Sequence, residues 1–188
     1  MDLKEIFRVY EEFSKLGNLA LVKGKPVCEF CSLKDVCCLE RKEVDVVFIF
    51  PFEKEFIESK LNVKIPIKVL KTKYGEIHLL KHFNSRCIFW DENRRCKIFK
   101  FAPIDCRTYP YSISYEKEKK NFFLIRYKEC QIIASNKKIR KLKALFEKLI
   151  EILPGSFWKS FDEIDKKIFK GKENSFENIF PLNVKLNF

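Results

Sequence analysis

Cysteine is the residue type in this sequence whose number and spacing could do chemistry. The 188 residues include eight cysteines, four of them within eleven residues. The eight positions are Cys28, Cys31, Cys37, Cys38, Cys87, Cys96, Cys106 and Cys130. The first two form a Cys-x2-Cys turn, which sets two thiolates at the separation that one metal ion requires. The pattern predicts that the eight cysteines are metal ligands, since packing as small apolar side chains would account for one of them but not for all.

The adjacent pair Cys37 and Cys38 bears on which metal is bound. Side chains of neighbouring residues diverge, so we expect the pair to reach two metal ions, or two irons of one cluster. Eight thiolates are also the number that two four-cysteine sites need. Aromatic residues near the cysteines, such as Phe89 and Trp90, suit the surroundings of an iron–sulfur cluster. The pattern leaves zinc and iron–sulfur open and slightly favours iron–sulfur.

Charged residues beside the later cysteines favour ligation. Arginines directly precede Cys87 and Cys96, and Arg107 directly follows Cys106. A cationic neighbour stabilises the thiolate, which is the form that binds metal. We expect Asp105 and Arg107 to hydrogen-bond to a ligating thiolate or to a substrate. The alternative is a salt bridge that holds this turn.

Other motifs of chemical interest are few. His78 and His82 have the spacing of a helical metal pair, but they fall in a segment that we interpret as a strand, where they lie too far apart to chelate together. We expect them to be ordinary surface histidines or hydrogen-bond partners of ligands. The sequence has neither a P-loop nor a G-x-G-x-x-G turn, and no G-x-S-x-G elbow. Nucleotide binding by those two routes is therefore not expected.

The cysteine motifs resemble those of the CxxCxxxCC cysteine-cluster family, also called YkgJ-like and described as a zinc- or iron-chelating domain. The resemblance rests on the four cysteines of the first cluster, on a middle block, and on the later Cys130. The middle block reads Cys87-Ile-Phe-Trp, then Cys96-Lys-Ile-Phe, then Pro103-Ile-Asp-Cys106-Arg107-Thr-Tyr109-Pro110. Together the three blocks cover about Cys28–Cys130.

Two positions depart from the family pattern: five residues separate Cys31 from Cys37 instead of three, and Ala102 stands where the family usually has Arg. The resemblance implies a zinc or iron–sulfur centre with the cysteines as ligands. A flagellin lysine methylase carries a similar cysteine domain, so methyl transfer to a protein side chain, or redox chemistry, is the alternative function. The resemblance extends to no catalytic residue, and whether the protein is an enzyme stays open.

The N-terminus and the hydropathy predict where the protein resides. The first seventeen residues are charged and periodic and lack the apolar core of a secretory signal. The longest apolar run, Val46–Phe52, is too short for a membrane span. We therefore expect a cytoplasmic protein with no membrane partner.

Cytosolic thiols are normally reduced, which favours metal ligation over disulfide bonds for the eight cysteines. The Lys-rich composition resembles that of archaeal proteins, in which disulfides are the alternative.

The charge balance raises the question of a nucleic-acid partner. Lys and Arg number 38 against 26 Asp and Glu, giving a formal charge of +12. Such an excess attracts polyanions. Only Asn136–Lys143 concentrates positive charge, and no nucleic-acid-binding motif accompanies it. A zinc-stabilised nucleic-acid binder is therefore the third hypothesis, and the metal ion is the expected partner, with a protein substrate as a further candidate.

Hydrophobic periodicity predicts the elements that would position the cysteines. Apolar residues recur at helical spacing near both ends of the chain and alternate in the middle. The expected helices are Asp2–Leu16, Phe52–Leu61, Lys137–Leu153 and Phe161–Lys170, the last capped by Ser160. The expected strands are Val44–Phe50, Ile65–Lys71 with Glu76–His82, and Tyr111–Tyr115 with Phe122–Tyr127. The tail from Lys172 to Phe180 is expected to be loose.

These elements predict an α+β fold, a single compact cysteine-rich domain with short strands and hairpins in the middle and helices at both ends. Residues 1–130 are expected to form the cysteine-cluster metal-binding region with its N-terminal helix. Residues 131–188 are expected to form a helical C-terminal extension packed on that region.

Overall fold

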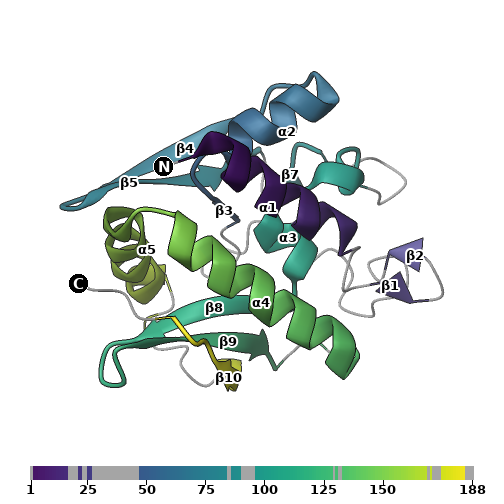
Figure 1. The fold of residues 1–188 in the computed structure, drawn as a ribbon. Coiled ribbons are helices and arrows are strands. Elements are labelled where there is room, and N and C mark those ends of the chain that lie inside the picture. Colours follow the sequence, from purple (N-terminus) through teal and green to yellow (C-terminus); the bar gives the residue numbers. More distant parts are fainter. Residues whose placement is uncertain are drawn as a thin grey trace.

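The computed structural model describes residues 2–16, 21–22, 25–26, 47–83, 86–89, 96–128, 130, 133–168, 170 and 175–184. Helices and small antiparallel sheets are mixed along this part of the chain, which confirms the α+β class (Figure 1). The cysteines of the first cluster, from Cys28 to Cys38, and the first residues of the predicted strand Val44–Phe50 lie outside the described residues. No helix in the described part of the chain is both long and apolar enough to cross a membrane.

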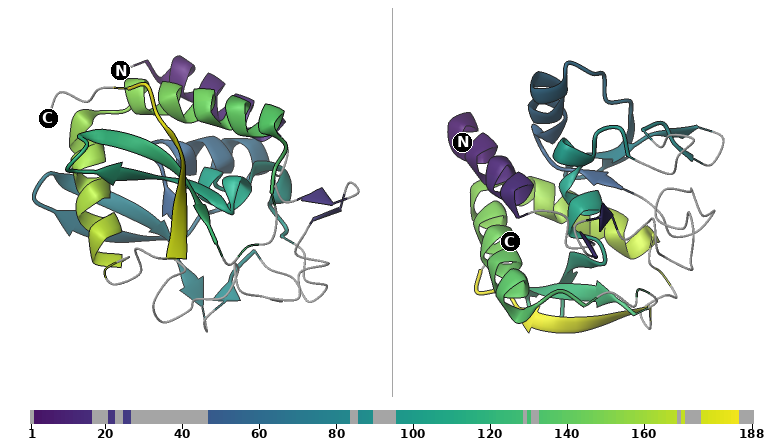
Figure 2. Two further views of the ribbon diagram at one scale, coloured as in Figure 1. Left: turned by 90° about the horizontal axis from the view of Figure 1, so that it is seen from below. Right: turned by 90° about the vertical axis from the view of Figure 1, so that its right-hand side faces the viewer.

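The helices form where the sequence predicts an apolar face. They are α1 (Leu3–Lys15), α2 (Glu53–Leu61), α3 (Ile104–Thr108), α4 (Asn136–Ile152) and α5 (Gly155–Ile168), with a short 3₁₀ helix η2 (Phe99–Phe101). Asp2 caps α1 by accepting a hydrogen bond from the N–H of Lys4 at 2.9 Å. Ser135 caps α4 in the same way. Helices α1 and α4 lie side by side along one face of the molecule (Figures 1 and 2).

The described strands form two three-stranded sheets and two short two-stranded ladders. The first sheet has the order β3 (Phe48–Ile49), β5 (Gly75–Leu80), β4 (Ile67–Thr72), and the second β10 (Phe176–Pro181), β9 (Asn121–Tyr127), β8 (Tyr111–Glu116). Strands β1 (Leu21–Val22) and β2 (Lys25–Pro26) form one ladder, and β6 (His82–Phe83) and β7 (Arg86–Cys87) the other. All of these pairings are antiparallel, and both predicted hairpins are present.

Helix α5 packs between the two larger sheets, which lie on opposite sides of the molecule in Figure 2. Its Trp158 is fully buried, and the centroid of its ring lies 5.3 Å from that of Phe122 on β9. The indole N–H of Trp158 donates a hydrogen bond to the carbonyl of Ile150 at 3.1 Å. The ring centroids of Phe161 on α5 and Phe48 on β3 are 4.8 Å apart. The C-terminal part of the chain thus supplies a large share of the core.

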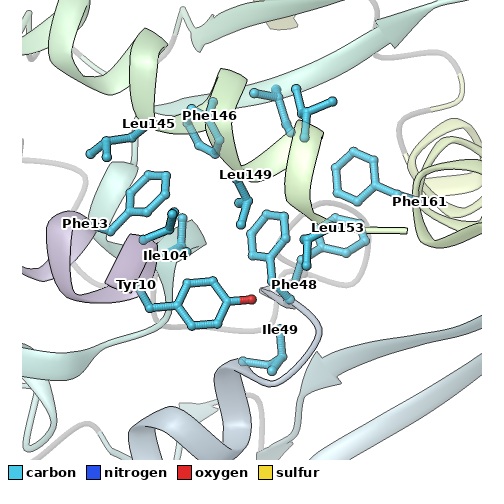
Figure 3. Close-up of a cluster of buried hydrophobic side chains, with 14 of the residues drawn as sticks. Tyr10, Phe13, Phe48, Ile49, Ile104, Leu145, Phe146, Leu149, Leu153 and Phe161 are labelled. Carbon is cyan, nitrogen blue, oxygen red and sulfur yellow. The ribbon is translucent and has the colours of Figure 1, made fainter. Parts of the chain in front are cut away.

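The centre of the core lies where α1, β3, α3, α4 and α5 converge (Figure 3). The rings of Phe13 on α1 and Phe146 on α4 pack edge to face, with their centroids 5.3 Å apart. Ile104, the first residue of α3, points into the same cluster. Burial of such side chains is worth about 1.5–3 kcal/mol each. The short helix α3, which carries Cys106, is therefore anchored to the main core.

Two predictions about the C-terminal part were wrong. Helix α5 begins at Gly155, and Ser160 lies buried inside it rather than at its cap, hydrogen-bonded to the hydroxyl of Thr72 at 2.7 Å. Pro154 opens the helix, because its carbonyl accepts from the N–H of Phe157 at 3.0 Å. In the tail, which was expected to be loose, Phe176–Pro181 forms strand β10 and pairs with β9. The last described element is therefore a strand, and the expectation of helices at both ends fits only in part.

Candidate metal centre

The structure describes four of the eight cysteines, each on a short segment next to the core. Cys87 ends β7, Cys96 precedes η2, Cys106 lies within α3, and Cys130 follows β9. Cys130 is buried and the other three are half-buried. Cys87, Cys96 and Cys106 pack against the apolar core.

Hydrogen bonds join these four segments to one another in a chain. The N–H of Lys97, next to Cys96, donates to the carbonyl of Phe89 at 2.8 Å and so joins the segments of Cys87 and Cys96. The side chain of Arg107, next to Cys106, donates to the carbonyl of Lys100, four residues beyond Cys96. The N–H of Tyr127 donates to the carbonyl of Pro110 at 2.9 Å, and the N–H of Cys130 to the carbonyl of Tyr127 at 3.3 Å. Segments more than forty residues apart in sequence are thus held in one part of the molecule.

A buried carboxyl group, Glu53, fixes the beginning of α3. Glu53 is 2% exposed, and its two oxygens accept from the N–H groups of Ile104 at 2.6 Å and Phe50 at 3.0 Å. Burial raises the pKa of Glu53 from 4.5 to about 8, although these two N–H groups act in the opposite direction. The carboxyl is therefore largely protonated at neutral pH. It joins the start of α2 to the segment that carries Cys106.

Asp105 makes a second connection between α3 and β3. Its Oδ2 accepts from the N–H of Phe48 at 3.1 Å. Burial raises the pKa of Asp105 from 3.8 to about 6, and hydrogen bonds from Phe48 and from the Ser112 hydroxyl oppose that shift. The structure places this predicted site residue beside Cys106 in sequence, with its carboxylate directed at the backbone of β3.

Arg107 is a buried cation on which two of the described cysteines, Cys96 and Cys106, act electrostatically. It is 6% exposed, and its guanidinium donates to the carbonyls of Ser14, Phe99 and Lys100 at 2.9, 3.1 and 2.7 Å. Burial lowers the pKa of Arg107, whereas Glu53 and the thiolates of Cys106 and Cys96 raise it. Within the described part of the chain Arg107 forms no salt bridge with a carboxylate, including Asp105.

The described residues alone do not assemble a complete ligand set. Among them, no group of three or more His, Cys, Asp or Glu side chains is close enough to hold a metal ion. The four cysteines of the first cluster lie outside this part of the chain. His78 lies on β5, with its Nε2 3.9 Å from a carboxylate oxygen of Glu76. His82 lies on β6, where it pairs in register with Cys87.

Glu53 is the residue of this site that the sequence did not single out. An acidic residue in the first turn of a helix is ordinary, because it interacts well with the helix dipole. The only signal was its position directly after the apolar run that ends at Phe52. Its burial depends on two N–H groups, one of them on Ile104, far along the chain.

Comparison with known proteins gives a partial likeness to one uncharacterized protein. None of the protein-family models matches the chain, and no solved structure matches it. Over 63 residues the sequence is 36% identical to an uncharacterized protein of Methanocaldococcus jannaschii. That match covers 30% of this chain and 35% of the other protein, so the chain spans about a third of the length of this relative.

Proposed function

We propose that this protein is a cytoplasmic metal-chelating cysteine-cluster protein, whose eight cysteines hold zinc or an iron–sulfur cluster. In this proposal Cys87, Cys96, Cys106 and Cys130 act together with the four cysteines of the first cluster. A zinc centre of four thiolates would stabilise the fold and be redox-silent, whereas an iron–sulfur cluster would supply one-electron chemistry. The number and spacing of the cysteines point to this function.

The observation that carries the proposal is the chain of hydrogen bonds between the segments of the four described cysteines. Contacts between Lys97 and Phe89, Arg107 and Lys100, and Tyr127 and Pro110 hold these segments in one region. These segments bury Phe89, Ile98 and Ile104 in the core, and a bound metal would add a further constraint on the positions of their cysteines. The buried guanidinium of Arg107 would favour thiolates at Cys96 and Cys106.

The surroundings of these cysteines support a slight preference for iron–sulfur over zinc. Phe89, two residues after Cys87, is buried, and Phe101, the last residue of η2, packs against the core. Apolar and aromatic neighbours lower the local dielectric constant, which is one of the factors that set the reduction potential of such a cluster.

The decisive experiment is to purify the full chain without oxygen and to measure its metals and its reactive thiols. We expect at least one zinc or iron centre per chain, and thiols that resist alkylation until a chelator is added. Brown colour with visible absorption identifies iron–sulfur, and a colourless zinc-containing protein identifies zinc. A protein with neither metal would contradict the proposal, and if its thiols also resisted alkylation the cysteines would be assigned to disulfides.

A matched pair of variants places the described cysteines in or out of the centre. Cys106→Ser changes one atom of the proposed ligand set and is expected to lower the metal content per chain. His78→Ala removes a potential ligand from β5, outside the hydrogen-bonded segments, and is expected to keep the metal content of the parent. Full metal retention by Cys106→Ser would exclude α3 from the centre.

A further inference from the structure

Strand β4 forms an edge of its sheet that is open to another strand. Among the described elements it pairs with β5 alone, and its register with β5 runs without a shift. Strand β10, an edge of the other large sheet, has a register shift and ends at Pro181, two features that discourage further pairing. Strand β4 has neither feature, and the hairpin that carries it projects beyond α5 in Figure 1.

The backbone groups of alternate residues of β4 point away from β5. The N–H of Lys81 donates to the carbonyl of Pro66 at 2.9 Å, so Pro66 faces β5. In an antiparallel strand this facing alternates from residue to residue. The N–H and C=O groups of Ile67, Val69 and Lys71 therefore point outward, where no described strand pairs with them. A second strand could bond to these groups without disturbing the pairing with β5.

The side chains along this edge place positive charge around an apolar residue. Val69 is 42% exposed, and Lys68 and Lys71, which flank it in the strand, are exposed as well. Neither lysine forms an ion pair with a described carboxylate. Glu76 is the register partner of Lys71, but its carboxylate lies 3.9 Å from Nε2 of His78. The edge is therefore positively charged, with an uncovered apolar position near its middle.

Lysines on an edge strand commonly protect it against pairing between copies of the same chain. Two copies joined along β4 would bring the Lys68 and Lys71 side chains of both together, and like charges across a strand pair destabilise it. This protection does not extend to an acidic strand, whose carboxylates would lie beside the ammonium groups. The charge of β4 thus disfavours a second copy and favours an acidic partner.

We propose that β4 binds an extended acidic segment of a partner protein by strand addition. The backbone of that segment would bond to the outward groups of Ile67, Val69 and Lys71. Because side chains alternate between the faces of a sheet, the segment would place an apolar residue beside Val69 and an adjacent acidic residue beside Lys68. A second acidic residue, two positions from the apolar one on its other side, would lie beside Lys71. The proposal does not depend on the metal centre.

The test measures binding of the full chain to the fluorescein-labelled peptide Ser-Glu-Val-Ser-Glu-Val-Ser by fluorescence anisotropy. We expect saturable binding below roughly 1 mM, and none for the same peptide with Lys in place of Glu. Two further peptides carry N-methyl groups on alternate sets of backbone nitrogens. One set faces β4 and the other faces solvent, so one peptide should lose binding and the other keep it. No binding of the parent peptide, or the same effect of both methylated sets, would overturn the proposal.

Variants of the chain test the two parts of the recognition. Val69→Pro removes an outward N–H at a position where an edge strand tolerates proline, and it should abolish binding. Lys71→Glu should weaken binding about 5-fold, whereas Lys137→Glu, the same charge change on α4, should not. Unchanged binding in Lys71→Glu would contradict the proposal. If Val69→Pro does not fold, the methylated peptides decide.

Two other occupants of this edge are outcomes of the same experiments. A dimer in sedimentation that Val69→Pro converts into a monomer would assign the edge to a second copy. A single-stranded oligonucleotide that binds more tightly than the acidic peptide, and that Lys71→Glu releases, would assign it to nucleic acid. Either result would overturn the acidic peptide as the ligand of β4.

Discussion

Two regions of the molecule are stabilised in different ways. The apolar body comprises α1, α4, α5 and strands β3, β5, β8 and β9, and its side chains interlock through many aromatic contacts. The cysteine-bearing segments, residues 86–89, 96–108 and 130, contain short elements joined by single hydrogen bonds. The first region is stabilised mainly by the hydrophobic effect. The second is anchored to the core by Phe89, Ile98 and Ile104 and is held in addition by individual buried polar atoms.

The contrast is clearest in how charge is buried. The described ion pairs of the body, such as Lys167 with Glu163 on α5, lie at its surface, where they contribute about 0–1 kcal/mol. The cysteine-bearing segments are instead held by Glu53 and Arg107, both almost fully buried. Because the pKa of Glu53 is about 8, its carboxyl is mostly neutral at pH 7, and Arg107 is the buried charge of these segments. A buried charge is retained at a cost in stability unless something compensates it.

The largest effect is expected from removing the central aromatic side chain of the body. Trp158→Ala would lose the contacts with Phe122 and Phe161 and should lower the free energy of unfolding by about 3–5 kcal/mol. The loss should be the same with and without metal, because Trp158 lies in the body. Urea denaturation measures it, with the exposed Tyr74→Ala as a control expected to cost less than about 1 kcal/mol. A loss that vanished in metal-free protein would break the distinction between the regions.

The next effect is expected from pH and is smaller for each pH unit, and it tests the buried carboxyl of the second region. The pKa of Glu53 is raised from 4.5 to about 8 in the folded protein, so the folded state binds the proton more tightly than the unfolded state. Its stabilising contribution is complete below about pH 4.5 and is lost as the pH rises through 8. The free energy of unfolding should therefore fall by up to about 1.4 kcal/mol per pH unit in this window.

Glu53→Gln should flatten that slope, as measured by urea midpoints between about pH 5 and 8. Asp165, which is buried on α5 and has a pKa raised from 3.8 to about 7, supplies the comparison within the body. Asp165→Asn should remove only the part of the slope below about pH 7 and leave the part between 7 and 8. An unchanged slope in Glu53→Gln would show that its carboxyl is ionised in the folded protein.

Two nearby positions are expected to differ in what they control: Ser135 the free energy of unfolding, by about 1 kcal/mol, and Cys130 the metal content. Ser135→Ala removes the cap of α4 and should cost about 0.5–2 kcal/mol, with no change in metal content. Cys130→Ser, five residues earlier, should change the unfolding of metal-free protein little and lower the metal bound per chain. Urea denaturation and elemental analysis of both variants give the two quantities. Equal metal loss in both would mean that α4, and not the sulfur, controls binding.

The body was largely predictable from the sequence because its pattern is local. Ile139, Leu142 and Phe146 recur at helical spacing and lie buried on α4, and the two predicted hairpins are present. Strand β10 was missed because its residues include Asn, Glu and Pro, which are uncommon in strands, and its place is set by pairing with β9. A tertiary contact of this kind leaves little trace in the segment itself.

The candidate site was predictable in its chemistry but not in its assembly. The cysteine spacing and the flanking Arg107 could be recognised without a structure. That Arg107 donates to Ser14 and Glu53 accepts from Ile104 could not, because each contact joins residues more than fifty positions apart. The metal assignment stays a prediction, since the first cluster lies outside the described residues.

The smallest expected effect concerns the turn between α4 and α5, where the prediction from sequence was wrong. If Pro154 and Gly155 only ended α4, alanine at Gly155 would gain nothing. Because Gly155 is instead the first residue of α5, with no atom within 4 Å of an added Cβ, Gly155→Ala should raise the free energy of unfolding by about 0.4–1 kcal/mol. Thermal melting detects this as a rise of a few degrees. The gain should appear equally in metal-free protein, since α5 belongs to the body, and a lowered melting temperature would contradict the observed start of α5.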